Sequence, residues 1–183
     1  MKIELSKVYR ILAPRIVVLI TSTNTLGGIN AAPVSFVSPV SFKPPILMIS
    51  LRPIRHTYKN IMENKEFVIN ILSKGYADRV LKCAVVYPEG INKLEVVGLH
   101  WYSSERIKVP RVKEAKVWFE CRFLEEKKMG DHLVIFAEVL IAEARDDVIT
   151  EGEVDLAKLN PILHIAKEKF ATDFKVVKYK RYD

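Results

Sequence analysis

The turn between Arg52 and Asn60 carries the residue types best suited to a chemical task. Its sequence, Arg-Pro-Ile-Arg-His-Thr-Tyr-Lys-Asn, joins an expected strand to the start of an expected helix. Thr57 is able to cap that helix, and Arg52, Arg55 and Lys59 concentrate positive charge around its free amides. A helix N-terminus beside arginines is a ready phosphate site. An ordinary capped, solvated helix end explains the same residues, so the turn alone leaves both interpretations open.

The preceding segment, Asn30 to Arg52, mixes serine and proline with apolar residues in a β-like pattern. Serine hydroxyls at positions 35, 38, 41 and 50 supply hydrogen-bonding groups. Proline cannot donate to a β ladder, so the first part of the segment is expected at an edge, a bulge or a wall. The prolines are Pro33, Pro39, Pro44 and Pro45. An edge strand with free amides is able to hold a planar, hydrogen-bonding ligand by backbone contacts.

The four histidines, at positions 56, 100, 132 and 164, show no metal-ligand spacing, and no metal site is expected. His132 follows the expected turn of a long hairpin, where it either lies beside a ligand or closes the turn together with Asp131. His164 stands among apolar residues, which favours a core or interface histidine.

The two cysteines, Cys83 and Cys121, are far apart in the chain and also lack metal-ligand spacing. Cys121 alternates with Val117, Phe119 and Phe123, which indicates a thiol buried in a core. A disulfide between the two cysteines stays open as an alternative.

The composition is that of a folded domain. At 183 residues and 49% hydrophobic, the chain is long enough for one sizeable core, so we expect a single domain over residues 1–183. The longest apolar run, Ile16 to Ile20, is too short to cross a membrane, and the first residues contain no apolar signal core. We therefore expect a cytoplasmic protein without membrane contacts.

The net charge is +7, and its distribution matters more than its size. The expected basic C-terminal tail, residues 175–183, sets four cations against Asp183 alone: Lys175, Lys178, Lys180 and Arg181. Such a tail attracts nucleic acid or an anionic cofactor. A solvated chain end is the more ordinary explanation.

Branched and alternating apolar residues predict mainly strands. The expected strands cover residues 15–23, 30–42, 46–51, 66–72, 116–127, 133–144 and 162–166, and the expected helices cover 55–64 and 76–86. Residues 30–42 are expected to form a hairpin with 15–23, and residues 162–166 a last inner strand. Within the first helix, Lys59 and Glu63 are expected to pair. Residues 88–110 are expected to be irregular.

This pattern favours a closed antiparallel β-barrel over a parallel sheet, because the long βα repeats of a parallel sheet are missing. No Gly-x-Gly-x-x-Gly follows a strand, and Gly-x-x-x-x-Gly-Lys-Ser/Thr is absent. Any nucleotide must therefore be held by another device.

Seven short motifs occur in the order found in one known family. They are the wall at 30–42, Lys43-Pro44-Pro45, Ser50, His56-Thr57-x-x-Asn60, Phe67-Val68-Ile69-Asn70, Glu120-Cys121 and Gly130-Asp131-His132. Over roughly residues 8–170, the chain resembles the flavin reductase-like family of FMN-binding split barrels. The extended segment at 88–110 makes it most similar to the flavoredoxin and archaeal branch.

The resemblance implies a mainly β fold, a six-stranded antiparallel split β-barrel of Greek-key type with a few short helices. It also implies a homodimer with FMN near the interface. By position, the flavin ring would lie along Asn30, Ala31, Ala32, Pro33, Val34 and Ser35. The phosphate and ribityl chain would lie among Ser50, Arg52, His56, Thr57 and Asn60, assisted by Arg55 and Lys93. His132 would lie beside the ring, and the loop with Trp101 and Tyr102 would cover the flavin of its own or the neighbouring subunit.

The expected function is that of an FMN-dependent oxidoreductase, which passes electrons from NADH, NADPH or another donor through FMN to an acceptor. A non-catalytic electron carrier with the same fold is the alternative. A basic β-barrel that binds nucleic acid is a third hypothesis, supported by the charge and the barrel. It is weakened because Phe36 and Phe42 have serine and proline neighbours rather than lysine and arginine.

Overall fold

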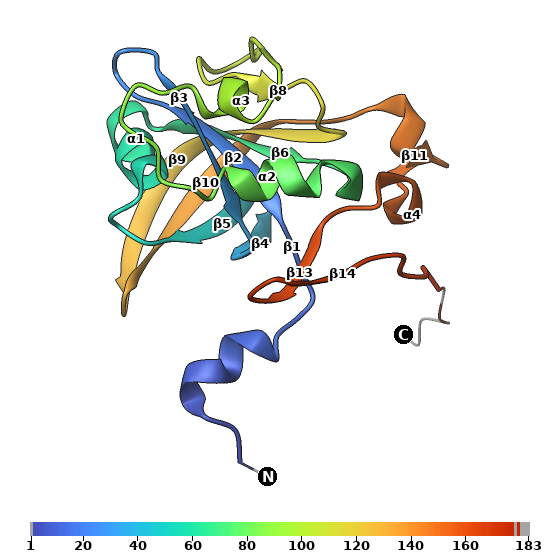
Figure 1. The fold of residues 1–183 in the computed structure, drawn as a ribbon. Coiled ribbons are helices and arrows are strands. Elements are labelled where there is room, and N and C mark those ends of the chain that lie inside the picture. The colour runs from blue at the N-terminus through green and yellow to red at the C-terminus, as the bar shows by residue number, and fades with distance from the viewer. Residues whose placement is uncertain (1, 178, 180–183) are drawn as a thin grey trace.

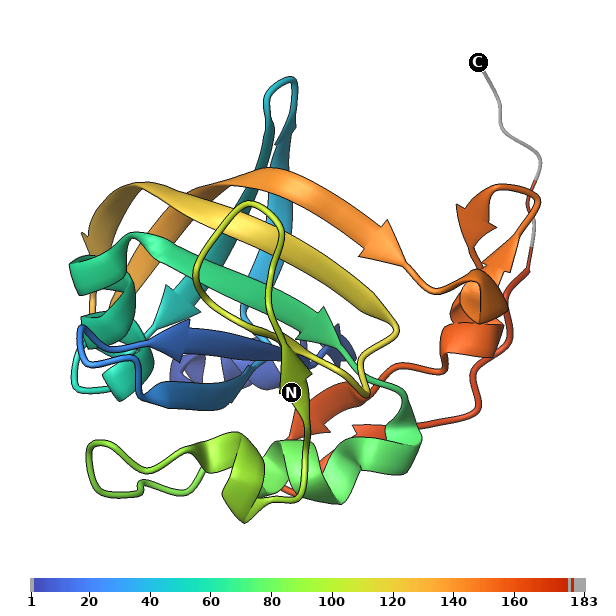
Figure 2. The same cartoon turned by 90° about the horizontal axis from the view of Figure 1, so that it is seen from above.

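The computed structural model of the chain describes residues 2–177 and 179. Its centre is a seven-stranded antiparallel sheet with the strand order β3-β2-β6-β9-β10-β5-β4 (Figures 1 and 2). The strands are β2 (Val18–Thr23), β3 (Ile29–Val34), β4 (Val37–Phe42), β5 (Pro45–Leu51), β6 (Glu66–Ile71), β9 (Val117–Met129) and β10 (His132–Ala144). The class is mainly β as expected, and the main sheet has one strand more than the six predicted.

The two edges of this sheet are formed by strands that follow each other in the chain. β3 pairs only with β2 and β4 only with β5, yet only Ser35 and Phe36 separate β3 from β4. A two-residue connection between opposite edges requires the sheet to curl until its edges meet, which makes a barrel that is split rather than fully bonded. Both edges carry proline, as predicted for strands that need not donate on their outer side.

The prediction of one strand over residues 30–42 is therefore wrong. Only its first half pairs with β2, and the second half pairs with β5 through a register shift between Pro39 and Ser41. Both halves contain proline, which marks edge strands correctly but carries no sign of the corner between them.

The hairpin of β9 and β10 is confirmed. It turns at Gly130 and Asp131, where Gly130 has a positive φ of 61° that suits a residue without a side chain. The register places His132 opposite Met129 at the start of β10. This position brings His132 to the rim of the barrel.

Three smaller sheets surround the barrel. They pair β1 (Arg15–Ile16) with β13 (Leu163–Ala166) and β14 (Lys169–Ala171), β7 (Trp101–Tyr102) with β8 (Arg111–Val112), and β11 (Ile149–Thr150) with β12 (Glu153–Val154). The prediction of an inner barrel strand at residues 162–166 is wrong, because this segment pairs with β1 and β14 outside the main sheet. Its mostly apolar sequence, Ile-Leu-His-Ile-Ala, fits either place.

The helices are short and lie around the barrel. The α-helices are α1 (His56–Asn64), α2 (Ala77–Lys82), α3 (Lys93–Val96) and α4 (Leu156–Leu159), and the 3-10 helices are η1 (Leu5–Arg10), η2 (Lys74–Tyr76) and η3 (Asp146–Val148). The first predicted helix is confirmed, and the second is shorter than predicted. The segment at 88–110 is only partly irregular, since it contains α3 and β7. Lys59 pairs with Glu89, Nζ to Oε1 2.5 Å, rather than with Glu63.

Two apolar clusters lie on the two faces of the sheet. Val18 and Ile20 pack with Phe67 and Cys121 in one, while Leu19 packs with residues of α2 and α3 in the other. A strand covered on both faces needs apolar residues at every position, which explains the continuous run in β2. Cys121 is buried as predicted, and both cysteines are free thiols.

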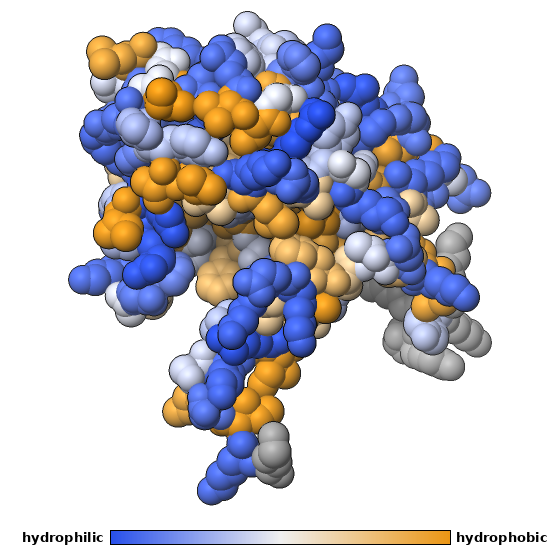
Figure 3. Space-filling model, viewed as in Figure 1, coloured by the Kyte–Doolittle hydropathy of each residue, from blue (hydrophilic) through white to orange (hydrophobic). Residues whose placement is uncertain are grey.

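The N-terminal arm, residues 2–12, stands away from the barrel (Figure 1). None of the residues of η1 is buried, although several are large and apolar. Figure 3 shows apolar side chains on this arm among polar ones. In the basic tail, Lys178, Lys180, Arg181 and Asp183 lie outside the described residues. None of the helices in the described part of the chain is long and apolar enough to cross a membrane.

Candidate functional site

A cavity of about 470 Å³ lies beside the edge strand β3 and the corner that follows it. Its wall combines β3 and the corner after it, the end of β5, the first turn of α1, the start of β10, and residues around 83–86 and 93. Most residues predicted from the sequence line it: Asn30, Ala32, Pro33, Val34, Ser35, Ser50, Arg52, Arg55, His56, Thr57, Lys93 and His132.

Two predicted site residues, Ala31 and Asn60, do not line the cavity. The Ala31 side chain packs into the apolar core on the α2 and α3 side of the sheet. Asn60 is buried one turn into α1, where its Nδ2 donates to Ser22 Oγ at 3.3 Å. It borders a neighbouring hollow of only about 20 Å³. Their side chains therefore support the cavity wall from behind.

The N-terminus of α1 opens into the cavity without a cap. Arg55, its N-cap residue, has an extended backbone and makes no capping hydrogen bond, and the first turn contains no acidic residue. The first N–H groups of a helix have no acceptor within the helix, and the helix dipole adds partial positive charge there. Since Arg55, His56 and Thr57 all line the cavity, this end is available to an anion.

Thr57 does not cap α1, so that prediction is wrong. Its hydroxyl oxygen instead accepts a hydrogen bond from Asn30 Nδ2 at 2.9 Å, and the same amide reaches Ser22 Oγ at 3.3 Å. This bond uses the Thr57 hydroxyl only as an acceptor, so the hydroxyl proton stays available for donation to another group. Oδ1 of Asn30 is buried and finds no donor among the described residues. The wall therefore holds an unsatisfied donor and an unsatisfied acceptor side by side.

Lys93 brings a buried positive charge to the cavity from α3, whose start is fixed by the Asn92 cap. Its Nζ donates to the Cys83 carbonyl at 3.3 Å and lies 5.8 Å from the centre of the Tyr87 ring. Burial lowers the pKa of Lys93, and the nearby Arg55 lowers it further against the opposing effect of Cys83. Burial raises the pKa of the Cys83 thiol to about 11. An anion between Lys93 and Arg55 would relieve their mutual repulsion.

None of the residues that line the cavity, all of them in the described part of the chain, carries a carboxylate. The lining holds three histidines and four permanent cations, namely Arg15, Arg52, Arg55 and Lys93. None of these four forms an ion pair with a described Asp or Glu. A concave wall with one sign of charge focuses the electrostatic potential. The cavity is therefore suited to a ligand with more than one negative charge.

His132 lines the cavity and also bonds to Asp131 in the hairpin turn. The two alternatives from the sequence, a position beside a ligand and a role in closing the turn, therefore hold together. Its Nδ1 lies 2.8 Å from Asp131 Oδ1, and this hydrogen bond lowers the pKa of Asp131. Its ring centre lies 5.8 Å from that of Phe36 at the corner between β3 and β4. The imidazole is thus held by its neighbour on one side and by an aromatic ring on the other.

Several cavity residues were missed from the sequence: Tyr9, Arg15, Phe36, Cys83 and His164. Phe36 lies within the predicted wall, so its place was within reach of sequence reasoning. Arg15 and His164 come together only through the pairing of β1 with β13, for which the sequence contains no signal. Trp101 lines a different hollow of about 500 Å³, so the prediction that it covers the cavity of its own subunit is wrong.

The residues present fit a flavin nucleotide, which combines a planar ring, a chain of hydroxyls and a phosphate. The edge strand β3 offers a straight wall, and Asn30 and Thr57 offer an acceptor and a donor. The open end of α1 with Arg55 and Lys93 offers an anion site. Among the described residues, His, Cys, Asp and Glu form no group of three able to hold a metal ion.

Comparisons with known proteins agree with this fit. Residues 10–171 match the model of the flavin reductase like domain. An uncharacterized protein of Aquifex aeolicus is 32% identical over 93% of this chain and 90% of its own length.

Solved structures are also similar over nearly the whole chain. The 2-nitrobenzoate 2-nitroreductase NbaA of Pseudomonas fluorescens superposes with a TM-score of 0.86 at 26% identity, over 98% of this chain and 95% of that chain. Flavoredoxin from Methanosarcina acetivorans superposes with a TM-score of 0.85 at 23% identity, over 98% and 94%. The matched domain covers most of the chain, and the seven-stranded split barrel agrees with it: the chain belongs to the flavin reductase-like family.

Proposed function

We propose that this chain binds FMN in the cavity and acts as an FMN-dependent oxidoreductase. Electrons would enter from NADH, NADPH or another donor and leave to an acceptor. One observation carries the proposal: the uncapped N-terminus of α1 opens, beside Arg55 and Lys93, into a cavity whose described lining has no carboxylate. A phosphate ester satisfies that arrangement better than a neutral ligand does.

In this proposal the phosphate binds at the first turn of α1. The helix amides and the Thr57 hydroxyl donate hydrogen bonds, while Arg55 and Lys93 supply charge from two sides. Arg52, at the end of β5, adds a third cation. Hydrogen bonds to charged groups each contribute about 1.5–3 kcal/mol, so two or three of them supply about 3–9 kcal/mol. Micromolar binding corresponds to about 8.2 kcal/mol, so contacts with the ring must supply part of the affinity.

The ring would lie against β3, where Pro33 leaves the outer side of the strand without a competing N–H. Asn30 Oδ1 would accept from a ribityl hydroxyl, and Ser50 lines the same wall. When bound, FMN supplies the exchange of a hydride or of single electrons. His132, held by Asp131 and packed near Phe36, would lie beside the ring and orient the molecule that reacts with it.

We further propose a homodimer in which the N-terminal arm packs against a second copy. The arm exposes large apolar side chains, each between 45% and 89% accessible: Ile3, Leu5, Val8, Ile11 and Leu12. Tyr9 of the arm lines the cavity, so a dimer formed through this arm would bring the partner close to the flavin. The full-length relatives give no evidence on this point.

The direct test is the colour of the purified protein. We expect a yellow protein, or one that takes up FMN at micromolar concentration, whose flavin absorbance bleaches on reduction. A colourless protein that binds no added FMN contradicts the proposal.

Anaerobic stopped-flow reduction separates the enzyme from the electron carrier. Rapid bleaching of the flavin band by NADH or NADPH supports a reductase. Bleaching by dithionite alone, with no response to either nicotinamide nucleotide at millimolar concentration, favours the carrier and excludes the nicotinamide-dependent enzyme.

A further inference from the structure

A second group of cavity residues takes no part in the proposed phosphate site, and of its members only His132 has a place beside the proposed flavin ring. This group, the Arg15 cluster, consists of Arg15, Tyr9, Phe36, His132 and His164, and all five line the cavity. They come from the N-terminal arm, β1, the corner after β3, β10 and β13. Residues from the N-terminal region, the corner after β3, β10 and β13 therefore converge at one place.

Arg15 is the centre of this cluster. Its guanidinium carbon lies 5.4 Å from the centre of the Phe36 ring. Nη1 donates to the carbonyls of Tyr9, at 2.5 Å, and Leu12. Nη2 donates to the Ile165 carbonyl at 3.4 Å and lies 3.4 Å from His164 Nδ1. These acceptors are all neutral, so they fix the guanidinium in place without compensating its charge.

The charge of Arg15 is also not balanced by an acidic side chain among the described residues. It forms no ion pair with a described carboxylate, and its Nε finds no acceptor among the described residues. A phosphate monoester carries about −1.5 to −2 charges at neutral pH, which Arg55, Lys93 and the end of α1 suffice to balance. Asp131, a carboxylate that adjoins the cluster, is mostly exposed and is bonded to His132.

Aromatic rings surround this cation. The Tyr9 ring meets the Phe36 ring edge to face at 6.4 Å, and the His132 ring lies 5.8 Å from Phe36 on another side. These rings pack directly on one another, so a planar group would stack on the ring surfaces that line the cavity, and a fixed guanidinium selects an anionic one. A neutral planar molecule would gain only the ring contacts.

We infer that the Arg15 cluster binds the anionic group of a planar second substrate, a conjugated carboxylate or a similar anion, which exchanges electrons with the bound flavin. This inference rests on the proposed function. Arg15 sets the charge preference, and Phe36 and Tyr9 bind the planar part. The N-terminal arm is then part of the substrate site, because Arg15 ties it to β13 through carbonyl groups on both.

The test compares benzoate with benzamide, which have nearly the same shape and differ in charge. Neither exchanges electrons, so binding is read by calorimetry on FMN-saturated protein, in which the phosphate site is already filled. We expect benzoate to bind at least about tenfold more tightly than benzamide, a difference of about 1.4 kcal/mol. Added salt should reduce the preference only partly, since the cluster lies inside a cavity.

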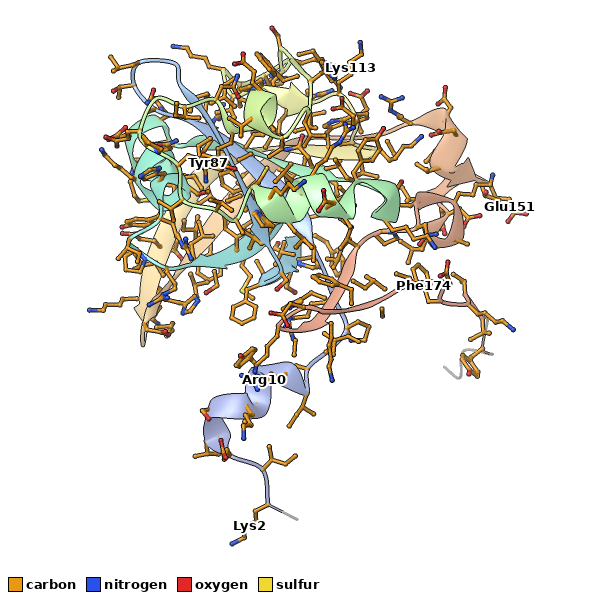
Figure 4. All side chains as sticks on the ribbon, in the orientation of Figure 1. Lys2, Arg10, Tyr87, Lys113, Glu151 and Phe174 are labelled. Atoms are coloured by element: carbon orange, nitrogen blue, oxygen red, sulfur yellow. The ribbon has the colours of Figure 1, made fainter. Side chains whose placement is uncertain are left out.

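Three variants test whether Arg15 causes the preference for benzoate over benzamide. Arg15→Gln should reduce the ratio of the two affinities to about one, since a neutral side chain gives an anion no advantage over an amide. Arg15→Lys keeps the charge but not the fork of donors, and should retain most of the preference. Lys113→Gln removes one positive charge on the side of the molecule away from Arg10 and should leave the ratio unchanged (Figure 4).

Equal affinity for the two probes in the unaltered protein overturns the inference, as does a preference that survives in Arg15→Gln. A changed flavin midpoint potential in Arg15→Gln with an intact benzoate preference also overturns it, because the charge then acts on the ring. Failure of the chain to bind FMN contradicts the proposed function instead, and the flavin absorbance of each sample separates the two cases.

Discussion

At the scale of single residues, Thr57 provides the sharpest test of the phosphate end of the cavity. Thr57→Val keeps the shape of the side chain and removes its hydroxyl. We expect the Kd for FMN to rise about 10- to 100-fold, because a hydrogen bond to a charged group contributes about 1.5–3 kcal/mol. Quenching of FMN fluorescence on titration measures the change. Thr25→Val, on an exposed loop, is the control, and equal Kd values for the two variants would contradict the assignment.

Lys93 should have opposite effects on folding and on binding. Lys93→Met removes a charge that is buried beside Arg55, so the ligand-free protein should become more stable while its affinity for FMN falls. Urea unfolding and fluorescence titration measure the two effects. A variant that is weaker in both respects would mean that the ammonium supports the fold.

The pH dependence of stability gives a second readout of Lys93. Its pKa in the folded protein is lowered from the ordinary value of 10.5. Below the lowered pKa, the lysine is charged in both states and the cost of its burial is fully present. Between the two values the unfolded chain binds more protons, so the free energy of unfolding rises with pH. Lys93→Met should lack this rise.

At the scale of elements, a buried ion pair fixes the segment that contains β7 against the barrel. Glu120 on β9 is fully buried and accepts the N–H groups of Glu105 and Arg106, each at 2.8 Å. It also accepts Nε of the buried Arg111 at 2.7 Å. Arg111 reaches the more exposed Glu143 with its Nη1 at 2.5 Å. One carboxylate therefore holds a loop and a strand together.

Glu120→Ala should destabilise the protein by about 3–5 kcal/mol, because it leaves the buried charge of Arg111 without its main partner. Glu143→Ala is the matched control, since it removes an exposed partner of the same arginine and should cost less than about 1 kcal/mol. Chemical unfolding followed by circular dichroism measures both. Equal losses of unfolding free energy in the two variants would show that the burial of Glu120 does not explain its effect on stability.

Low pH should destabilise the protein through protonation of the Glu120 carboxylate. Burial opposes the charge of Glu120, but the two N–H groups and Arg111 together hold its pKa below the ordinary 4.5. Its stabilising effect is fully present above 4.5 and is lost as the pH falls through the lowered value. The free energy of unfolding of Glu120→Gln should therefore fall less steeply in acid than that of the unaltered protein.

Elements with strong local patterns were predictable, and those fixed by pairing were not. β9 and β10 are 13 residues each and flank a Gly-Asp turn, so their hairpin follows from the sequence. α1 likewise follows from its spacing of apolar residues. The corner between β3 and β4 was missed because it arises from closure of the barrel. Residues 162–166 were misplaced because strand pattern alone does not name a partner.

At the scale of the whole molecule, the N-terminal arm is the clearest expected interface. Val8→Asp places a charge on an apolar side chain that is exposed in the single chain. We expect it to shift a dimer toward monomer without loss of fold, as measured by sedimentation equilibrium and circular dichroism. Leu26→Asp, at a site that is 92% exposed on the loop between β2 and β3, is the control. A monomeric unaltered protein would contradict the proposed homodimer.

In the cavity, too, residues that are close together in the sequence were predictable, and residues brought together from distant segments were not. The part of the cavity lining near the start of α1 was predictable because Arg52, Arg55 and Thr57 lie close together in the sequence. The Arg15 cluster was not, because its members come from both ends of the sequence. Their meeting depends on how β1 and β13 pair beside the barrel. The extent of the single domain and the role of the basic tail stay predictions.

The uncapped start of α1 would make the stability of this protein depend on the supply of the proposed flavin. Without a ligand, the free amides, the orphaned Asn30 oxygen and the unopposed cations all weaken the native state. A ligand that binds only the folded chain stabilises it by about 2.7 kcal/mol at a hundred times its Kd. In a cell short of flavin, the empty chain would unfold more often and be degraded sooner. The abundance of the protein would then follow the concentration of the flavin without any dedicated regulator.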